Sequence, residues 1–245
     1  MKQISAKALR LSFLRWFIGG ASVFTHGRMQ TLGLVYAMEP IIRDLYEGEE
    51  DITARLLSYR TLFNTEPQIG AAVIGMAAAL EEDRANGSGM SDEMMRTVRT
   101  GLMGSLAGLG DAMLVSAVIP LLLCTVLGFG AAGALLYIAV YGIIGAYLQY
   151  RLFLRVYRKR DEGLVFLYGR KTEAAVRACR HGALFCIAAA FGRYGLLPEG
   201  VPGLGISCLI VLAGAYCLKK QKLSTGQVLL CMLACTALYG FLAAG

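Results

Sequence analysis

Three short polar clusters stand out as places where side chains could bind a polar solute: residues 25–30, 63–70 and 101–111. Their amide and carboxylate groups can exchange hydrogen bonds with hydroxyl groups, which apolar side chains cannot do. Ionisable residues set in apolar sequence are also typical of functional sites in membrane proteins. The candidates for a polar pathway, or for contacts with another subunit, are Gln30, Asn64, Glu66, Gln68 and Asp111.

The second cluster is expected to open a helix. Pro67 suits a first helical turn because its missing N–H has no partner there in any case. Asn64 or Thr65 could cap that helix, which leaves amide and carboxylate groups at its entry.

The third cluster is rich in glycine and ends at Asp111. Its glycines permit a tight backbone turn, which Asp111 would then fix. The same spacing also fits close packing between helices, and Asp111 could instead cap a helix that starts at Ala112. The four glycines are Gly101, Gly104, Gly108 and Gly110.

Enzyme chemistry finds little support in the chain. The only histidines are His26 and His181, which cannot build a multi-histidine metal site, and no phosphate loop, nucleophile elbow or HExxH motif occurs. The acidic run 81–83 could hold a hard cation, but three consecutive helical residues do not share a face, so a solvated helix end is favoured. We therefore expect no catalytic residue, metal or cofactor on this chain.

The elements that must position these clusters are membrane helices. Residues 112–150 contain no Asp, Glu, Lys or Arg, and this stretch is long enough for two crossings of a bilayer. Hydrophobic residues make up 56% of the 245, and charged residues only 17%, which is low for a soluble domain. The chain is therefore predicted to be a membrane protein.

Five spans are predicted in the C-terminal region, and the basic residues orient them. Basic residues concentrate at 151–180 and 219–222, between apolar segments, as the positive-inside rule expects of cytoplasmic loops; this placement argues against a nucleic-acid partner. With both basic segments in the cytoplasm, an odd number of spans puts the C-terminus on the extracytoplasmic side of the membrane. The predicted spans are Met113–Phe129, Ala132–Gln149, Gly182–Leu197, Gly203–Leu218 and Gln227–Ala244.

The N-terminal region has apolar segments that are too short or too interrupted to span. Trp16–Met38 is broken by His26 and Arg28, and Ile69–Leu80 is only about half as long as a crossing requires. Re-entrant or discontinuous helices are expected here, although a cytoplasmic helical domain resting on the membrane is an open alternative. The predicted fold is an all-α polytopic membrane protein with a motif-bearing region, 1–111, and a transmembrane region, 112–245.

Several motifs resemble one known family. FNTEPQIGAAVIGMAAALEE at 63–82 and GLMGSLAGLGD at 101–111 are similar to the IID component of the mannose/fructose/sorbose-type sugar phosphotransferase system. RMQTLGLVYAMEPIIRDLY at 28–46 and LKKQKLSTGQVLL at 218–230 resemble further segments of that family, in the same order. The whole chain would then be one IID domain in the bacterial cytoplasmic membrane.

The resemblance implies a permease subunit. It implies that a IIC subunit joins this chain to move a mannose-type hexose or related sugar, that IIC–IID pairs assemble further, and that soluble IIA and IIB components carry the phosphoryl group from phosphoenolpyruvate. The chain departs from the family pattern at Thr25–Gly27, where Asn-Tyr-Glu is usual, and at Ser105, where proline is usual. A structural or degenerate paralogue that scaffolds the IIC subunit without binding sugar is therefore the alternative.

Overall fold

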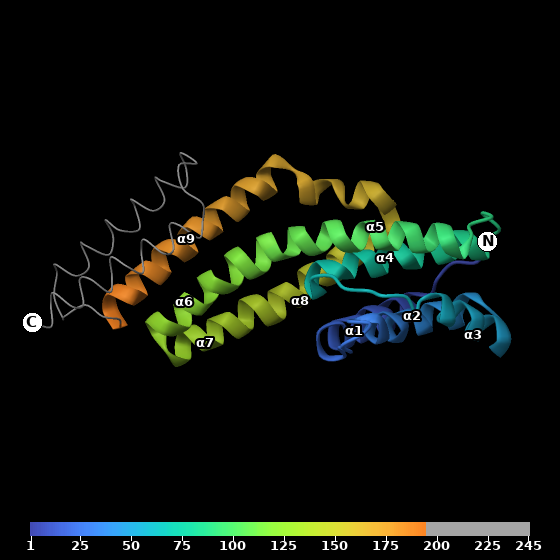
Figure 1. Cartoon of the computed structure of the whole chain (residues 1–245), viewed down its shortest axis with the longest axis horizontal. Coiled ribbons are helices and arrows are strands. Elements are labelled where there is room, and N and C mark those ends of the chain that lie inside the picture. The colour runs from blue at the N-terminus through green and yellow to red at the C-terminus, as the bar shows by residue number, and fades with distance from the viewer. Residues whose placement is uncertain (195–245) are drawn as a thin grey trace, which may run out of the picture. The chain divides into compact units, whose positions relative to one another are not determined.

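The computed structural model describes the backbone of residues 1–194 and the side chains of residues 1–184. Within this range the chain is helical, and its β-pairing is limited to isolated bridges at Thr25–Met29 and Met29–Phe63 (Figure 1). The helices in order are α1 Ala6–Ser22, α2 Thr31–Leu45, α3 Glu49–Ser58, α4 Pro67–Ala85, α5 Asp92–Gly110, η1 Asp111–Val118, α6 Ile119–Phe129, α7 Ala131–Tyr137, η2 Ile138–Ile144, α8 Gly145–Lys159, η3 Arg160–Gly163, η4 Val165–Tyr168 and α9 Arg170–Tyr194. Of the η segments, η1 and η2 are π-helical and the other two are 3-10 turns.

The chain divides into two compact units. The first contains residues 1–114 and 139–173, and the second contains, of the described residues, 115–138 and 174–194. All three polar clusters of the sequence therefore lie in the first unit, together with α8.

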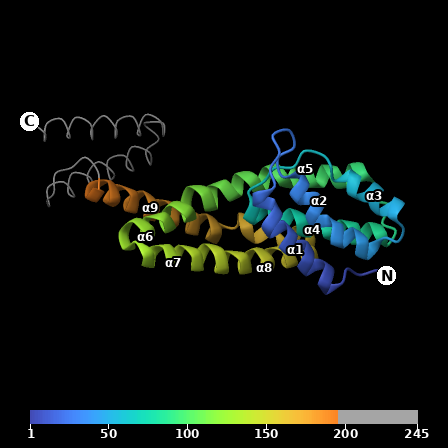
Figure 2. The ribbon, with the colours of Figure 1, turned by 90° about the horizontal axis from the view of Figure 1, so that it is seen from below.

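Helix α4 is the core of the first unit. Ala71, Ala72, Ala78 and Ala79 are fully buried, and α4 packs against α1, α2, α5 and α8 (Figure 2). Because these side chains are small, four helices can approach α4 closely, so its burial extends around the whole helix rather than along one stripe. A Cβ atom on Gly75 would collide with the backbone carbonyl of Phe153 in α8, so glycine is required at that crossing.

Polar contacts tie the N-terminal segment to the far end of α4. The backbone N–H of Lys2 donates to Asn86 Oδ1 at 2.7 Å, and Asn86 Nδ2 donates back to the Lys2 carbonyl at 2.8 Å. Ser5 caps α1 by accepting from the N–H of Ala8 and donates through its own N–H to Asp44. These bonds fix where α1 begins relative to α2 and α4.

The glycine-rich stretch 101–110 is not a turn, which corrects the sequence prediction. Gly101, Gly104 and Gly108 lie inside α5, where an added Cβ would meet nothing, while Gly110 is its last residue. Because η1 continues α5 directly, Asp111 does not cap a new helix at Ala112, and the helical run extends over Asp92–Phe129.

Among the described residues, two helical runs are long and apolar enough to cross a membrane: Asp92–Phe129 and Ala131–Gly163. They contain the first two predicted spans. The third predicted span begins inside α9, and its end, the last two predicted spans and the C-terminus lie outside the described residues. The interrupted stretch 16–38 contains the end of α1 and the start of α2, which are joined through residues 23–30.

Replacing Gly75 tests the α4–α8 crossing. We expect Gly75→Ala to destabilise the protein by about 1–3 kcal/mol, because the new methyl group has no room beside the Phe153 carbonyl. Gly101→Ala is the matched control: it lies in a helix with open space around it, and should be neutral or stabilising by up to about 1 kcal/mol. Thermal unfolding midpoints of the detergent-purified variants measure both effects, and equal midpoints would contradict the required close approach.

Candidate functional site

The start of α2 and the loop before α4 are joined by direct hydrogen bonds. The N–H of Gln30 donates to the Phe63 carbonyl at 2.8 Å, and the N–H of Thr65 donates to Gln30 Oε1 at 2.8 Å. Met29, which has a left-handed backbone (φ 50°), pairs with Phe63 in a parallel bridge. The first and second polar clusters are thus one site, which we call the Gln30–Thr65 junction (residues 29–30 and 63–66).

The junction contains two buried polar atoms without a partner. Gln30 and Thr65 are 0% and 4% exposed, yet Gln30 Nε2 and Thr65 Oγ1 form no hydrogen bond with any described residue. Only one other buried side-chain atom, Ser12 Oγ, shares this condition among the described residues. A buried polar group without a partner costs free energy, so a donor and a hydroxyl of this kind are suited to a polar ligand or water.

Aromatic packing holds the junction in place. Trp16 Nε1 donates to the Pro67 carbonyl at 2.8 Å, and the Trp16 ring meets the Phe63 ring edge-on at 5.8 Å between centroids. A Cβ on Gly70 would lie 2.7 Å from Trp16 Cζ2, so the absence of a side chain there lets the indole reach the loop. Trp16, the single tryptophan of the chain, was not among the sequence candidates.

Glu66 caps α4, a role that the sequence prediction assigned to Asn64 or Thr65. Glu66 Oε2 accepts from the N–H of Ile69 at 2.9 Å, and Pro67 follows in the first turn as predicted. The carboxylate thus satisfies one of the helix's N–H groups that have no partner within the helix. A Cβ on Gly110 would collide with Glu66, which explains a glycine at the end of α5.

The sequence candidates fall into two groups. Gln30 and Glu66 are buried in the junction together with Thr65, which sequence reasoning did not select as a site residue. Asn64 is exposed, and its N–H donates to Met103 Sδ at 3.1 Å. Gln68 is half-buried in the first turn of α4, and Asp111 is exposed directly after Gly110, on the segment that approaches Glu66.

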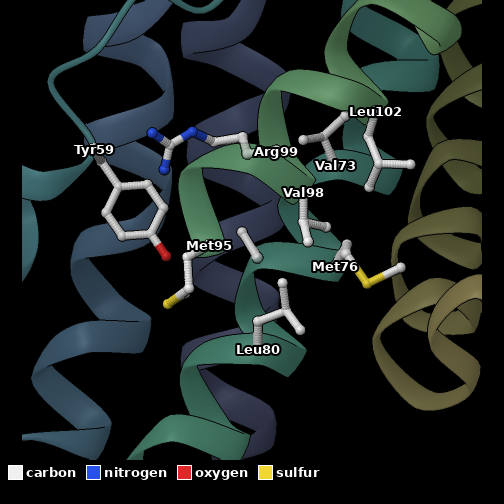
Figure 3. A pocket seen from close by; sticks show the side chains of 9 residues that line it. Tyr59, Val73, Met76, Leu80, Met95, Val98, Arg99 and Leu102 are labelled. Carbon is white, nitrogen blue, oxygen red and sulfur yellow. The ribbon is translucent and has the colours of Figure 1, made fainter. Parts of the chain in front are cut away.

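A second buried cluster lies at the other end of α4, and sequence reasoning missed it. Glu81 is fully buried and accepts hydrogen bonds from the hydroxyls of Tyr46 and Tyr59, both at 2.8 Å. Burial raises the pKa of Tyr59, and the charge of Glu81 raises it further, so the phenol stays neutral and donates. Arg99 stacks over the Tyr59 ring at 4.8 Å (Figure 3). It also donates to Thr61 Oγ1 at 2.6 Å.

This buried cluster of Tyr46, Tyr59, Glu81 and Arg99 is structural rather than a solute site. The cavity beside Tyr59 and Arg99 measures about 10 Å³, which is room for roughly one water molecule. Its other walls are apolar side chains of α4 and α5, among them Val73, Met76 and Leu102 (Figure 3). Arg99 instead fixes the backbone at Ser58–Thr61, and the Thr61 carbonyl in turn accepts from Thr31 Oγ1 at 2.9 Å.

The acidic run does not form a solvated helix end or a metal site. Glu81 is buried against two tyrosines, Glu82 accepts from the N–H of Ile4 and from the Tyr157 hydroxyl, and Asp83 pairs with Arg160. Three sets of partners on different elements keep the carboxylates apart, as expected for consecutive positions on a helix. Solvation was therefore the wrong prediction for Glu81, because aromatic residues far away in sequence cover it.

Comparisons with known proteins show that this chain matches a family. Residues 3–194 match the family described as the PTS system mannose/fructose/sorbose family IID component. The mannose-specific EIID component of Escherichia coli (strain K12) is 36% identical over 136 residues, which is 55% of this chain and 48% of that protein. The fructose permease IID component of Bacillus subtilis (strain 168) is 29% identical over 198 residues, 79% of this chain and 71% of that protein. The matched part spans about half the length of the E. coli relative.

Two solved structures share the fold. A chain described as a membrane protein superposes with a TM-score of 0.71 at 23% identity and covers 95% of each chain. The mannose transporter ManYZ, solved in complex with microcin E492, contains a chain that superposes with a TM-score of 0.58 at 23% identity and covers 98% of this chain and 97% of that one.

Glu81→Ala tests the buried cluster. Its removal leaves the two tyrosine hydroxyls without their acceptor and takes a negative charge away from the buried Arg99. We therefore expect a loss of about 2–4 kcal/mol in unfolding free energy. Glu50→Ala, at an exposed position of α3, is the matched control and should change stability by less than about 0.5 kcal/mol. Denaturant unfolding of the purified variants measures the difference, and similar values for both would refute a structural role for Glu81.

Proposed function

Because the chain belongs to the IID component family of the mannose/fructose/sorbose phosphotransferase system (PTS), we propose that it is the membrane subunit of a phosphoenolpyruvate-dependent sugar permease. With a IIC subunit it forms the unit that moves a mannose-type hexose or a related sugar across the bacterial cytoplasmic membrane. The phosphoryl group comes from soluble IIA and IIB components, and no residue of this chain carries it. Pairs of IIC and IID subunits assemble further.

The observation that carries this proposal is the Gln30–Thr65 junction. Its two unpartnered atoms, Gln30 Nε2 and Thr65 Oγ1, supply a donor and a donor–acceptor, the groups that exchange hydrogen bonds with sugar hydroxyls. Asn64 is exposed beside them, and Gln68 is half-buried in the first turn of α4. In this proposal Glu66 orients the start of α4. Asp111, which directly follows Gly110, contributes a carboxylate to the polar pathway or to the contact with another subunit.

Exposed apolar side chains along the two long helical runs support insertion in a bilayer. An extended apolar surface of this kind is more favourable against lipid or another subunit than against water. The short helices α1, α2 and α4 are then re-entrant or discontinuous elements that carry the polar motifs of region 1–111, and region 112–245 supplies about five spans. Large apolar residues that are exposed on the long runs are Leu123, Leu127, Phe129, Leu135, Ile138 and Ile143.

A scaffold that binds no sugar is the second candidate, and the structural roles of two candidate side chains favour it. The Glu66 carboxylate caps α4, and the side-chain carbonyl of Gln30 accepts from the N–H of Thr65, so both candidate side chains already have a structural role. In that case the chain holds the IIC subunit in place and the sugar contacts lie elsewhere.

Thr65→Val separates the two candidates. Because Thr65 Oγ1 has no protein partner among the described residues, replacing it by an isosteric methyl group should leave folding and membrane content unchanged. We expect sugar uptake, in cells that also produce the IIC, IIA and IIB components, to fall about tenfold, the effect of losing one hydrogen bond of about 1.4 kcal/mol. Thr53→Val, at an exposed position of α3, is the control. Unchanged uptake with Thr65→Val would favour the scaffold.

The proposed topology has a separate test. With basic segments 151–180 and 219–222 in the cytoplasm, five spans put the C-terminus outside. We expect alkaline phosphatase fused after Gly245 to be active and a fluorescent protein fused there to be dark. The reverse pattern would contradict the five-span parity without bearing on the IID assignment.

A further inference from the structure

Helix α8 carries a cationic stripe and no acidic residue of its own. Arg151, Arg155 and Arg158 recur at spacings of four and three residues, so they share one side of the helix, and all three are exposed. Helix α8 contains no acidic residue, and none of the three arginines forms an ion pair with any described residue. The nearest acids in the sequence, Asp161 and Glu162, follow in η3 and are exposed.

The other side of α8 is occupied by the protein core. Gln149, Phe153, Val156 and Tyr157 are buried, and α8 packs closely against α4 at Gly75. The stripe is therefore held outward by the packing of the helix. It extends over about 11 Å from Arg151 to Arg158, at 1.5 Å per residue.

Along the same side, the helix changes from apolar to aromatic to cationic. Ile143 and Tyr147 lie eight and four residues before Arg151 and are 70% and 57% exposed. Arg151 donates to the Tyr147 hydroxyl at 3.1 Å, and Arg155 stacks over the Phe166 ring at 4.4 Å, so aromatic rings orient two of the guanidinium groups. Aliphatic, then tyrosine, then arginine is the order of residues from the hydrocarbon of a bilayer to its headgroups.

We propose that Arg151, Arg155 and Arg158 form a binding surface for the phosphate groups of anionic phospholipids. The proposal rests on the membrane placement given above, since the helical run Ala131–Gly163 must cross the bilayer for the stripe to emerge at headgroup level. A guanidinium group matches two phosphate oxygens at once, which an ammonium group cannot do. A lipid is the occupant because its acyl chains can contact Ile143 and Tyr147 while its phosphate meets the arginines; a soluble partner could reach only the cationic end.

Retention of anionic lipid tests this surface. The full chain is reconstituted into vesicles of equal parts phosphatidylglycerol and phosphatidylcholine, re-extracted in mild detergent, and its copurifying lipid is measured by mass spectrometry. Wild type should retain an excess of phosphatidylglycerol, and each arginine removed in Arg151→Gln, Arg155→Gln and Arg158→Gln should lower that excess about fivefold. The three corresponding lysine variants keep the positive charge but lose the paired N–H donors of the guanidinium group. They should therefore retain an intermediate excess of phosphatidylglycerol.

The control removes the same charge elsewhere. Lys7→Gln, Arg10→Gln and Arg96→Gln, all at exposed positions, should leave the excess as in wild type when combined. An equal lipid ratio for wild type and the arginine-to-glutamine triple variant overturns the proposal. The proposal is also overturned if this triple variant retains phosphatidylglycerol as wild type does but loses sugar uptake, a result that would assign the stripe to a soluble partner. A carbonate wash of membranes distinguishes failure of the membrane placement from failure of the lipid surface. Release of the wild-type chain by carbonate would refute the membrane placement. A wild-type chain that stays in the membrane but shows no lipid preference would refute the lipid surface only.

Discussion

The burial of α4 is the constraint on which the rest of the first unit depends. The buried alanines and glycines of α4 let α1, α2, α5 and α8 approach from several sides, and a Cβ on Gly75 would collide with the backbone of α8. The polar groups at each end of this buried helix need hydrogen-bond partners. Glu66 provides one at the start, through the N–H of Ile69, and Glu81 anchors the last turns through two tyrosine hydroxyls.

The candidate sugar site is a consequence of that arrangement. Because α4 is fixed, its N-terminal loop is fixed too, and Trp16 from α1 and Gln30 from the start of α2 close over it. Arg99 supports the same loop from α5 through Ser58 and Thr61. Three helices thus place the amide of Gln30 and the hydroxyl of Thr65 within a buried, rigid setting. The energetic cost of two unpartnered polar atoms there is consistent with a function that requires them.

Sequence reasoning succeeded where the signal was local and failed where it depended on distant partners. Pro67 was correctly placed in a first turn, because its fixed φ and missing N–H favour that position whatever surrounds it. The stretch 101–110 was wrongly expected to turn, because glycine permits a turn but does not require one, and the helix propensity of its neighbours prevailed. Glu81 was wrongly expected to be solvated, because its covering residues Tyr46 and Tyr59 lie 35 and 22 residues away.

By itself the sequence determined the helical class, the apolar runs long enough to cross a bilayer, and the IID family through motifs at 28–46, 63–82 and 101–111. The first two properties follow from composition and from the length of the apolar runs, and the family follows from the resemblance of those motifs, in order, to known members. The tertiary structure decided which polar groups are buried, which glycines are required and which side chains hold the loop before α4. Those outcomes depend on contacts between residues that are distant in sequence, such as Gln30 with Thr65 and Trp16 with Pro67, and only packing around α4 brings them together.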